Sequence, residues 1–123
     1  GYGMLTVYEK RGGRWQFRNT VQGFVEPVQQ FEIDPRGVIW ATHLSRGVYR
    51  VELSGDLRRA IKVQSYTQLG HDEANSQIHV MKIRGDIVLS DGNNLYTPTS
   101  SGHFTAVQAD TVSYTICRRL SSA

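Results

Sequence analysis

The densest group of side chains able to hold a metal ion lies in residues 71–75, where His71, Asp72 and Glu73 are consecutive and Asn75 follows. Imidazole and carboxylate groups are ligands of zinc, and oxygen ligands suit calcium. Consecutive side chains rarely converge on one ion, so this segment indicates a polar surface loop. The oxygen-rich stretch 90–94 lacks the glutamate of a calcium-binding loop and indicates a turn between strands. We expect no metal site and no cofactor.

Two kinds of catalysis need residues that this sequence does not visibly bring together. A glycoside hydrolase holds two carboxylates about 5 to 9.5 Å apart, whereas Asp34, Asp86 and Asp91 all stand in expected turns. A catalytic thiol needs a positioned base, and the single cysteine, Cys117, has no histidine at a spacing typical of a known family. We therefore expect no catalytic residues in these 123 residues.

A short pattern occurs three times along the chain. The segments GMLTVYEKRGGRW, GVYRVELSGDL and NLYTPTSSGHF begin at Gly3, Gly47 and Asn94, which are 44 and then 47 residues apart. The first two copies alternate apolar and polar residues, and each copy reaches a glycine turn and then has a bulky apolar residue, Trp15, Leu57 or Phe104, that opens a returning strand. A period of two predicts a strand with one buried face, so each copy predicts a β-hairpin.

A second hairpin precedes the first in two of the three copies. In VQQFEIDPRGVIWATH the order Asp34, Pro35, Arg36, Gly37 is typical of a type I turn. The matching segment is IHVMKIRGDIVLS, with Gly85 in place of Gly37. Two hairpins in series make a four-stranded antiparallel sheet in about 45 residues, the size of a β-propeller blade. No segment predicts a helix.

The expected fold class is therefore all-β, a partial propeller of about two and a half blades built from four-stranded antiparallel sheets. We expect a half blade at residues 1–22, blades at 24–64 and 77–109, and a tail or the start of a further segment at 110–123. Since the first unit lacks its leading hairpin, the chain is expected to be a fragment that self-associates through its open end sheets. The structural repeat positions are Trp15, Gly37, Trp40, Gly47, Tyr49, Gly85, Tyr96 and Phe104.

The segment FEIDPRGVIWATHLSRGVYRVEL resembles the two-component regulator propeller repeat. The matching residues are Ile33, Asp34, Gly37, Ile39, Trp40, Thr42, Gly47, Val48 and Tyr49, and more weakly Gly85, Ile87, Leu95 and Tyr96 in the next unit. Val88 replaces the tryptophan there, and Ala41 replaces the family's usual glycine. The resemblance implies a blade from the sensory region of a bacterial hybrid sensor kinase or a triple-tyrosine-domain regulator. It also implies an oligosaccharide ligand, with further blades and signalling domains as partners.

The composition and charge of the chain limit the kinds of partner that we expect it to bind. The formal charge is +3, and the basic residues gather at residues 10–18, 58–62 and 118–119 without an accompanying nucleic-acid motif, so we expect no nucleic-acid partner. No apolar run approaches the roughly 20 residues that span a bilayer, so we expect no membrane contact. If a ligand touches this chain, the loop before Gly47, with His43, Ser45 and Arg46, is the first candidate.

The sequence thus favours a non-catalytic sensory or ligand-binding propeller fragment of a bacterial signalling protein. A periplasmic location is expected, with a cytoplasmic one as the alternative. Two other functions stay open: a propeller hydrolase or lyase acting on polysaccharide, and a protein-interaction propeller without a small ligand.

Overall fold

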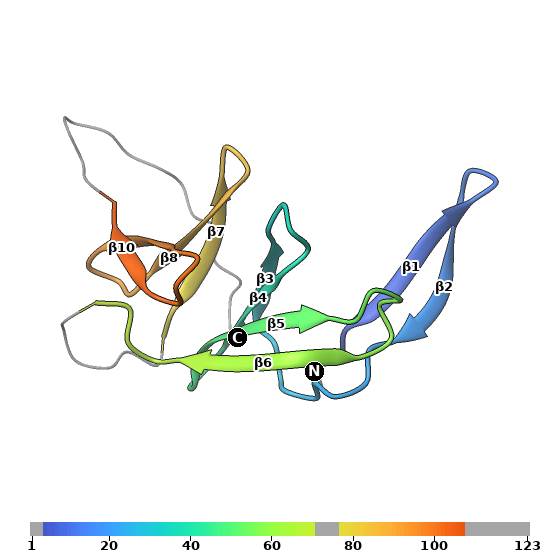
Figure 1. The fold of residues 1–123 in the computed structure, drawn as a ribbon, viewed down its shortest axis with the longest axis horizontal. Coiled ribbons are helices and arrows are strands. Elements are labelled where there is room, and N and C mark those ends of the chain that lie inside the picture. Colours follow the sequence, from blue (N-terminus) through green and yellow to red (C-terminus); the bar gives the residue numbers. More distant parts are fainter. Residues whose placement is uncertain (1–3, 71–76, 108–123) are drawn as a thin grey trace.

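The computed structural model describes residues 4–70 and 77–107. These residues form strands and no helix, arranged in three antiparallel sheets (Figure 1). The first sheet pairs β1 (Thr6–Arg11) with β2 (Arg14–Thr20). The second contains β3 (Gln30–Ile33), β4 (Ile39–His43), β5 (Gly47–Leu53) and β6 (Ala60–Tyr66). The third contains β7 (His79–Ile83), β8 (Asp86–Ser90), β9 (Leu95–Pro98) and β10 (Phe104–Ala106).

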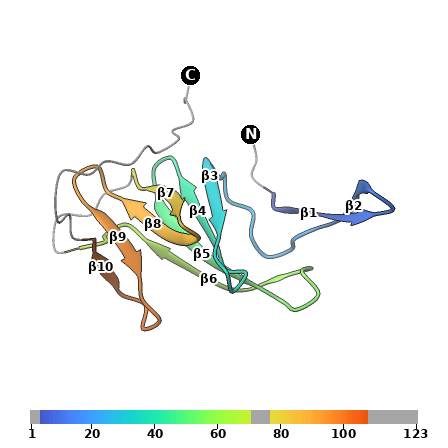
Figure 2. The ribbon, with the colours of Figure 1, turned by 90° about the horizontal axis from the view of Figure 1, so that it is seen from above.

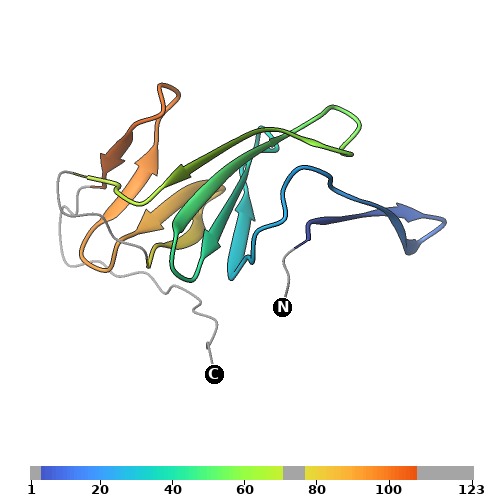
Figure 3. The same ribbon diagram turned by 90° about the horizontal axis from the view of Figure 1, so that it is seen from below.

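Both four-stranded sheets are meanders, because neighbouring strands in each sheet follow one another along the chain. The β3–β6 sheet lies between the β1–β2 hairpin and the β7–β10 sheet, as two views show (Figures 1 and 2). Strand β7 lies against β3 and β4, and the Val80 N–H donates to Gln30 Oε1 at 3.3 Å. Seen from below, the β1–β2 hairpin extends away from both larger sheets (Figure 3). Within the described residues no helix is long and apolar enough to cross a membrane.

The tight turns follow from their residue types. Gly12 and Gly13 join β1 to β2 with φ of 58° and 77°, and Arg84 and Gly85 join β7 to β8 with φ of 52° and 86°. Two successive positive φ angles match the twist of the flanking strands. At the β3–β4 turn, Asp34 Oδ1 accepts the N–H groups of Arg36 at 2.9 Å and Val38 at 3.0 Å. The turn expected at residues 34–37 is therefore confirmed.

The β5–β6 connection is longer than the sequence pattern indicated. We expected the returning strand to open at Leu57, but β6 begins at Ala60. The Ser54 hydroxyl donates to Asp56 Oδ1 at 2.7 Å, and that oxygen also accepts the Arg58 N–H at 3.1 Å. These bonds build a loop in which Leu57 has a φ of 63°. A left-handed residue interrupts a strand, so the strand starts after it.

The β3–β6 sheet is buried on both faces because its residues alternate between two cores. Trp40 and Val48 face the β7–β10 sheet and pack with Val80, Ile87 and Leu89. The opposite face packs against residues that flank the β1–β2 hairpin. The buried members of this second core are Leu5, Val21, Phe24, Ile39, Ala41, Tyr49 and Val51.

The aromatic repeat positions are not equivalent. Trp40, Tyr49 and Tyr96 are buried, and Phe104 is partly buried against the core between the two larger sheets. Trp15 differs, because it is 71% exposed. Its face of the two-stranded sheet has no second sheet against it in the described part of the chain, and the Lys10 ammonium lies 5.9 Å from the Trp15 ring centre.

Replacing Trp40 tests the core between the sheets. Trp40→Ala should lower the free energy of unfolding by about 3–5 kcal/mol, because it empties a buried volume between β4 and the β7–β10 sheet. Trp15→Ala, the matched control at an exposed site, should cost less than about 1 kcal/mol. Urea unfolding followed by circular dichroism measures both, and equal losses would contradict this assignment of the core.

Alanine substitutions at Gly47 and Gly85 distinguish two costs, the strain of a positive φ and the steric clash of an added Cβ. Both have positive φ, 77° and 86°, but a Cβ at Gly47 would meet the Tyr66 carbonyl oxygen, while a Cβ at Gly85 has nothing within 4 Å. Alanine at either site should cost about 1–2 kcal/mol of strain. Gly47→Ala should cost clearly more, since the backbone of β6 must move. Similar unfolding free energies for the two variants would show that the β5–β6 contact is loose.

Candidate functional site

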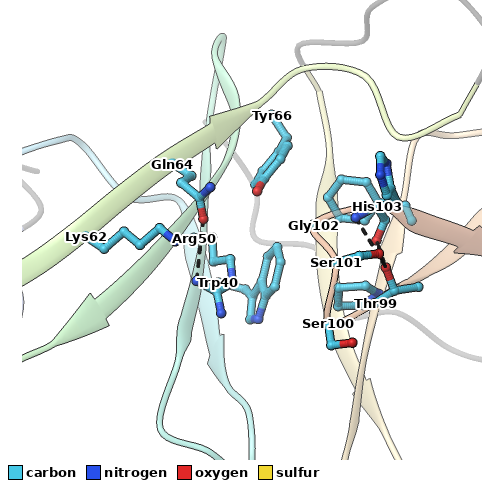
Figure 4. Close-up of a pocket in the computed structure, with 12 residues that line it drawn as sticks. Trp40, Arg50, Lys62, Gln64, Tyr66, Thr99, Ser100, Ser101, Gly102 and His103 are labelled. Carbon is cyan, nitrogen blue, oxygen red and sulfur yellow. Dashed lines mark hydrogen bonds between the residues drawn. The ribbon is translucent and has the colours of Figure 1, made fainter.

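A groove runs between the outer strands of the two four-stranded sheets. One wall comes from β4, β5 and β6, and the other from the β9–β10 turn (Figure 4). The cavity measures about 190 Å³. Its lining residues are Trp40, Arg50, Lys62, Gln64, Tyr66 and residues 98–104.

A second space of about 390 Å³ adjoins the first. Both spaces are lined by Trp40, Arg50 and residues 98–100, so Trp40 and Arg50 stand where they meet. The second space adds residues 34–36 from the β3–β4 turn, Asp86 and Ile87 from β8, and Thr97 from β9. The two sheets therefore diverge into one extended groove with aromatic, cationic and hydroxyl groups along it.

Strand alternation explains why these side chains converge. Residues 62, 64 and 66 stand two apart on β6 and share one face, and Arg50 pairs with Gln64 across β5 and β6. Arg50 also pairs with Trp40 across β4 and β5, so all five side chains face the β7–β10 sheet. Close to β7 this face is apolar and buried, whereas on the outer strands it is polar and lines the groove.

Three aromatic rings form one end of the groove. Trp40 stacks on Tyr66 with ring centres 6.4 Å apart and planes at 28°. Phe104 meets both rings edge-on, at 6.1 Å from Trp40 and 5.0 Å from Tyr66. Figure 4 shows the Trp40 and Tyr66 rings between the two sheets, opposite the residues of the β9–β10 turn. Such a cluster offers an apolar surface next to polar groups.

The Trp40 indole N–H is a buried donor without an acceptor among the described residues. Only 3% of Trp40 is exposed. A buried polar group normally has a partner, because an unmet hydrogen bond costs about 1–3 kcal/mol. An acceptor atom of a ligand, or of an ordered water, would satisfy it.

Two cations of the groove, Arg50 and Lys62, are held by one carboxylate. Arg50 Nη1 lies 2.7 Å from Glu52 Oε2, and Lys62 Nζ lies 3.9 Å from the same oxygen. The Arg50 guanidinium also lies 5.8 Å from the centre of the Trp40 ring. Exposed ion pairs add little stability, but these contacts orient the guanidinium over the indole. The site is suited to holding a polar molecule with an apolar face.

The ligand residues expected from the sequence lie elsewhere. His43, Ser45 and Arg46 come together at the β4–β5 turn, where the Ser45 N–H donates to His43 Nδ1 at 3.0 Å. Arg46 Nη1 lies 3.6 Å from Glu26 Oε2. None of the three lines the groove, and their role in binding stays a prediction. Tyr66 and Ser100 were missed, because their proximity depends on how two sheets pack.

Of the remaining sequence motifs, the stretch 90–94 lies within the described residues and has a structural explanation. Asp91 Oδ1 accepts the N–H groups of Asn93 at 2.9 Å and Asn94 at 2.8 Å, so the stretch 90–94 is a turn as expected. Within residues 4–70 and 77–107, no three His, Cys, Asp or Glu side chains gather where they could hold a metal ion. The 71–75 cluster and Cys117 lie outside the described residues.

Comparisons with known proteins identify no relative, since no family model matches the chain and neither a curated protein nor a solved structure matches it significantly.

The Asp91 turn predicts a loss of stability in acid. Burial alone would raise the pKa of Asp91, but hydrogen bonds from the Asn94 and Asn93 N–H groups and from Tyr96 outweigh it and leave the pKa below its ordinary value of 3.8. A carboxylate with a lowered pKa stabilises the folded state above the ordinary value, and this contribution disappears as the pH falls through the lowered pKa.

Stability measured by urea unfolding from about pH 6 to pH 2 should therefore decline most below the ordinary pKa. Asp91→Asn should be less stable at neutral pH and should show a flatter curve in acid, because the ionisable group is gone. Parallel curves for the two proteins would show that Asp91 does not contribute to the acid sensitivity.

Proposed function

We propose that this chain is a non-catalytic, ligand-binding part of a β-propeller in a sensory protein, and that the groove binds an oligosaccharide. The observation that carries the proposal is the packing of two consecutive four-stranded meanders. Their first strands, β3 and β7, lie against each other, and the sheets diverge toward their last strands. Blades around a propeller axis have this relation, because the inner strands crowd together and the outer strands spread.

The β1–β2 hairpin supports the same interpretation. By the repeat it corresponds to β5–β6 and β9–β10, the outer pairs of the larger sheets. The residues that flank this hairpin, Leu5, Val21 and Phe24, pack on the face of the β3–β6 sheet opposite to that covered by β7–β8, while the hairpin itself extends outward. Three units in a row, each covering the next, are what a propeller arc requires.

Several residues that match the regulator propeller repeat specify turns or close strand contacts, and every blade of a repeat needs such features. Asp34 caps the β3–β4 turn, and Gly37 has a φ of 86° there. Gly47 has a φ of 77° at a point where β5 approaches the backbone of β6. We therefore infer a place in a bacterial two-component or related regulator, in the periplasm, with signalling domains elsewhere in the protein as its partners.

The groove supports an oligosaccharide as the ligand class. Sugar rings present an apolar face and a hydroxyl rim, and this groove has aromatic rings beside a guanidinium and hydroxyl groups. The unmet Trp40 N–H adds a donor for a hydroxyl or ring oxygen.

One observation favours hydrolysis as a second candidate function. Asp34, in the β3–β4 turn, and Asp86, at the start of β8, line the same space between the sheets. Two carboxylates across a groove are the minimum for glycoside hydrolysis. Against catalysis, Asp34 Oδ1 already accepts two backbone N–H groups of its own turn.

Calorimetric titration with a panel of neutral and acidic oligosaccharides tests the proposal. At least one should bind, and Tyr66→Ala should weaken that binding about fivefold or more, because stacked rings contribute roughly 1 kcal/mol or more. Tyr66→Phe keeps the ring and should bind nearly normally. Ile61→Ser, on β6 but outside the groove, is the matched control.

The same mixtures, analysed by chromatography after long incubation, should contain intact oligosaccharide. Cleavage that Asp86→Asn abolishes would overturn the non-catalytic assignment. Binding to none of the panel, or unaltered binding by Tyr66→Ala, would overturn the groove as the site.

A further inference from the structure

The groove between the two larger sheets is electrostatically uneven along its length. The smaller space, of about 190 Å³, is lined by two cations, Arg50 and Lys62, and by no carboxylate of the described residues. The larger space, of about 390 Å³, is lined by two arginines, Arg36 and Arg50, and also by two aspartates, Asp34 and Asp86. The positive charge of the groove is therefore concentrated in the smaller space.

The carboxylate of Glu52 balances this charge only in part. Glu52 Oε2 lies 2.7 Å from Arg50 Nη1 and 3.9 Å from Lys62 Nζ. Glu52 faces Lys62 across β5 and β6 and does not line the smaller space, so it contacts both cations from outside the cavity. Two positive charges and one negative charge leave one positive charge at this end of the groove.

The Arg50 guanidinium has donors left for a second acidic group. Among the described residues, its hydrogen bonds to Glu52 Oε2 at 2.7 Å and Gln64 Oε1 at 3.5 Å both come from Nη1. A guanidinium carries further N–H groups in a planar fork that can meet both oxygens of one acid. Only 23% of the Arg50 side chain is exposed. An ion pair at such a sheltered group is stronger than one on the open surface.

A sugar that carries an acidic group can contact the cations and the aromatic rings together. Trp40 and Tyr66 line the same space as the two cations. Figure 4 shows Arg50 and Lys62 on one wall of the groove, and the hydroxyl groups of residues 99–101 on the other wall. A pyranose stacked on a ring would then direct its acidic substituent at the cations and its hydroxyl groups at the opposite wall.

We propose that the ligand of this groove is an anionic oligosaccharide, and that Arg50 and Lys62 together bind one carboxylate or sulfate group of it in the smaller space. This inference rests on the proposed function, because it names the charge of the oligosaccharide. A neutral sugar of the same shape leaves the charge of both cations uncompensated, so these two residues determine specificity. Asp34 and Asp86 disfavour a second acidic group in the larger space, since like charges repel.

Matched pairs of sugars test the effect of charge alone. Trisaccharides of glucuronate, galacturonate and mannuronate are titrated calorimetrically beside their methyl esters, which keep the rings and lose the charge. At least one acid should bind about tenfold or more tightly than its ester. Raising the NaCl concentration should reduce this preference, because the exposed Lys62 ammonium is screened by salt. A sulfated neutral trisaccharide in the same series shows whether the preferred group is a sulfate or a carboxylate.

Variants of the two cations locate the acidic group. Arg50→Gln and Lys62→Gln should each weaken binding of the preferred acid about fivefold or more, while binding of its ester should change less than about twofold. Arg11→Gln is the matched control and should bind both sugars normally. Arg11 also forms an ion pair, with Nε 2.8 Å from Glu9 Oε1, but it does not line the groove.

Glu52→Gln should strengthen binding of the acid. Glutamine keeps an oxygen that can accept from Arg50 but carries no charge, so the positive charge at the smaller space is no longer balanced. We expect binding of the acid to improve about threefold or more and binding of the ester to stay unchanged. Equal effects on the two sugars would contradict an electrostatic role of this end of the groove.

The outcomes distinguish this inference from the proposed function. If a methyl ester binds as tightly as its acid and Tyr66→Ala weakens that binding, the oligosaccharide site stands and the anionic specificity is overturned. A preference for the acid that survives both Arg50→Gln and Lys62→Gln would also overturn it. If none of the sugars binds, the proposed function fails and this inference fails with it. Circular dichroism verifies that each variant is folded.

Discussion

The burial of β4 on both of its faces is the constraint on which the rest of this structure depends. Ile39 and Ala41 are buried on one side and Trp40 on the other, with 5%, 0% and 3% of their surfaces exposed. A strand can bury both faces only when another layer covers each side of its sheet. The β1–β2 unit and the β7–β10 sheet supply these layers, so the β3–β6 sheet cannot be stable as an isolated meander.

Neither layer covers its face of the β3–β6 sheet completely, and the uncovered part of each face forms a groove. The β7–β10 sheet fits closely at β3 and β4 but diverges from β5 and β6, where Arg50, Lys62 and Gln64 replace the apolar residues. On the other side, Leu5, Val21 and Phe24, which flank the β1–β2 hairpin, cover β4 and β5, whereas Phe31 and Ile33 of β3 stay exposed. The first feature is the polar groove between the larger sheets, and the second is an apolar groove beside β1, lined by Phe31, Ile33 and residues 4–8 among others.

The two grooves also differ in how fixed their walls are. The polar groove is lined by side chains held in ring contacts and ion pairs, such as Arg50 between Trp40 and Glu52. The apolar groove is bounded by a two-stranded sheet, and two strands alone are marginally stable in water. The self-association expected from the sequence, through the open end sheets, stays a prediction.

The sequence by itself determined the strands and most turns, because alternation and turn chemistry act over a few residues. Asp34, Gly37 and Gly85 specify their turns locally, and the alternation from Gly47 to Leu53 specifies which residues of β5 share a face. It misplaced the start of β6 because the hydrogen bonds of Ser54 and Asp56 shape the loop before it. Only the tertiary structure decided that Trp40 is buried while Trp15 is exposed, and that Tyr66 meets Phe104. Those outcomes depend on which sheet covers which face, and residues far apart in the chain control that packing.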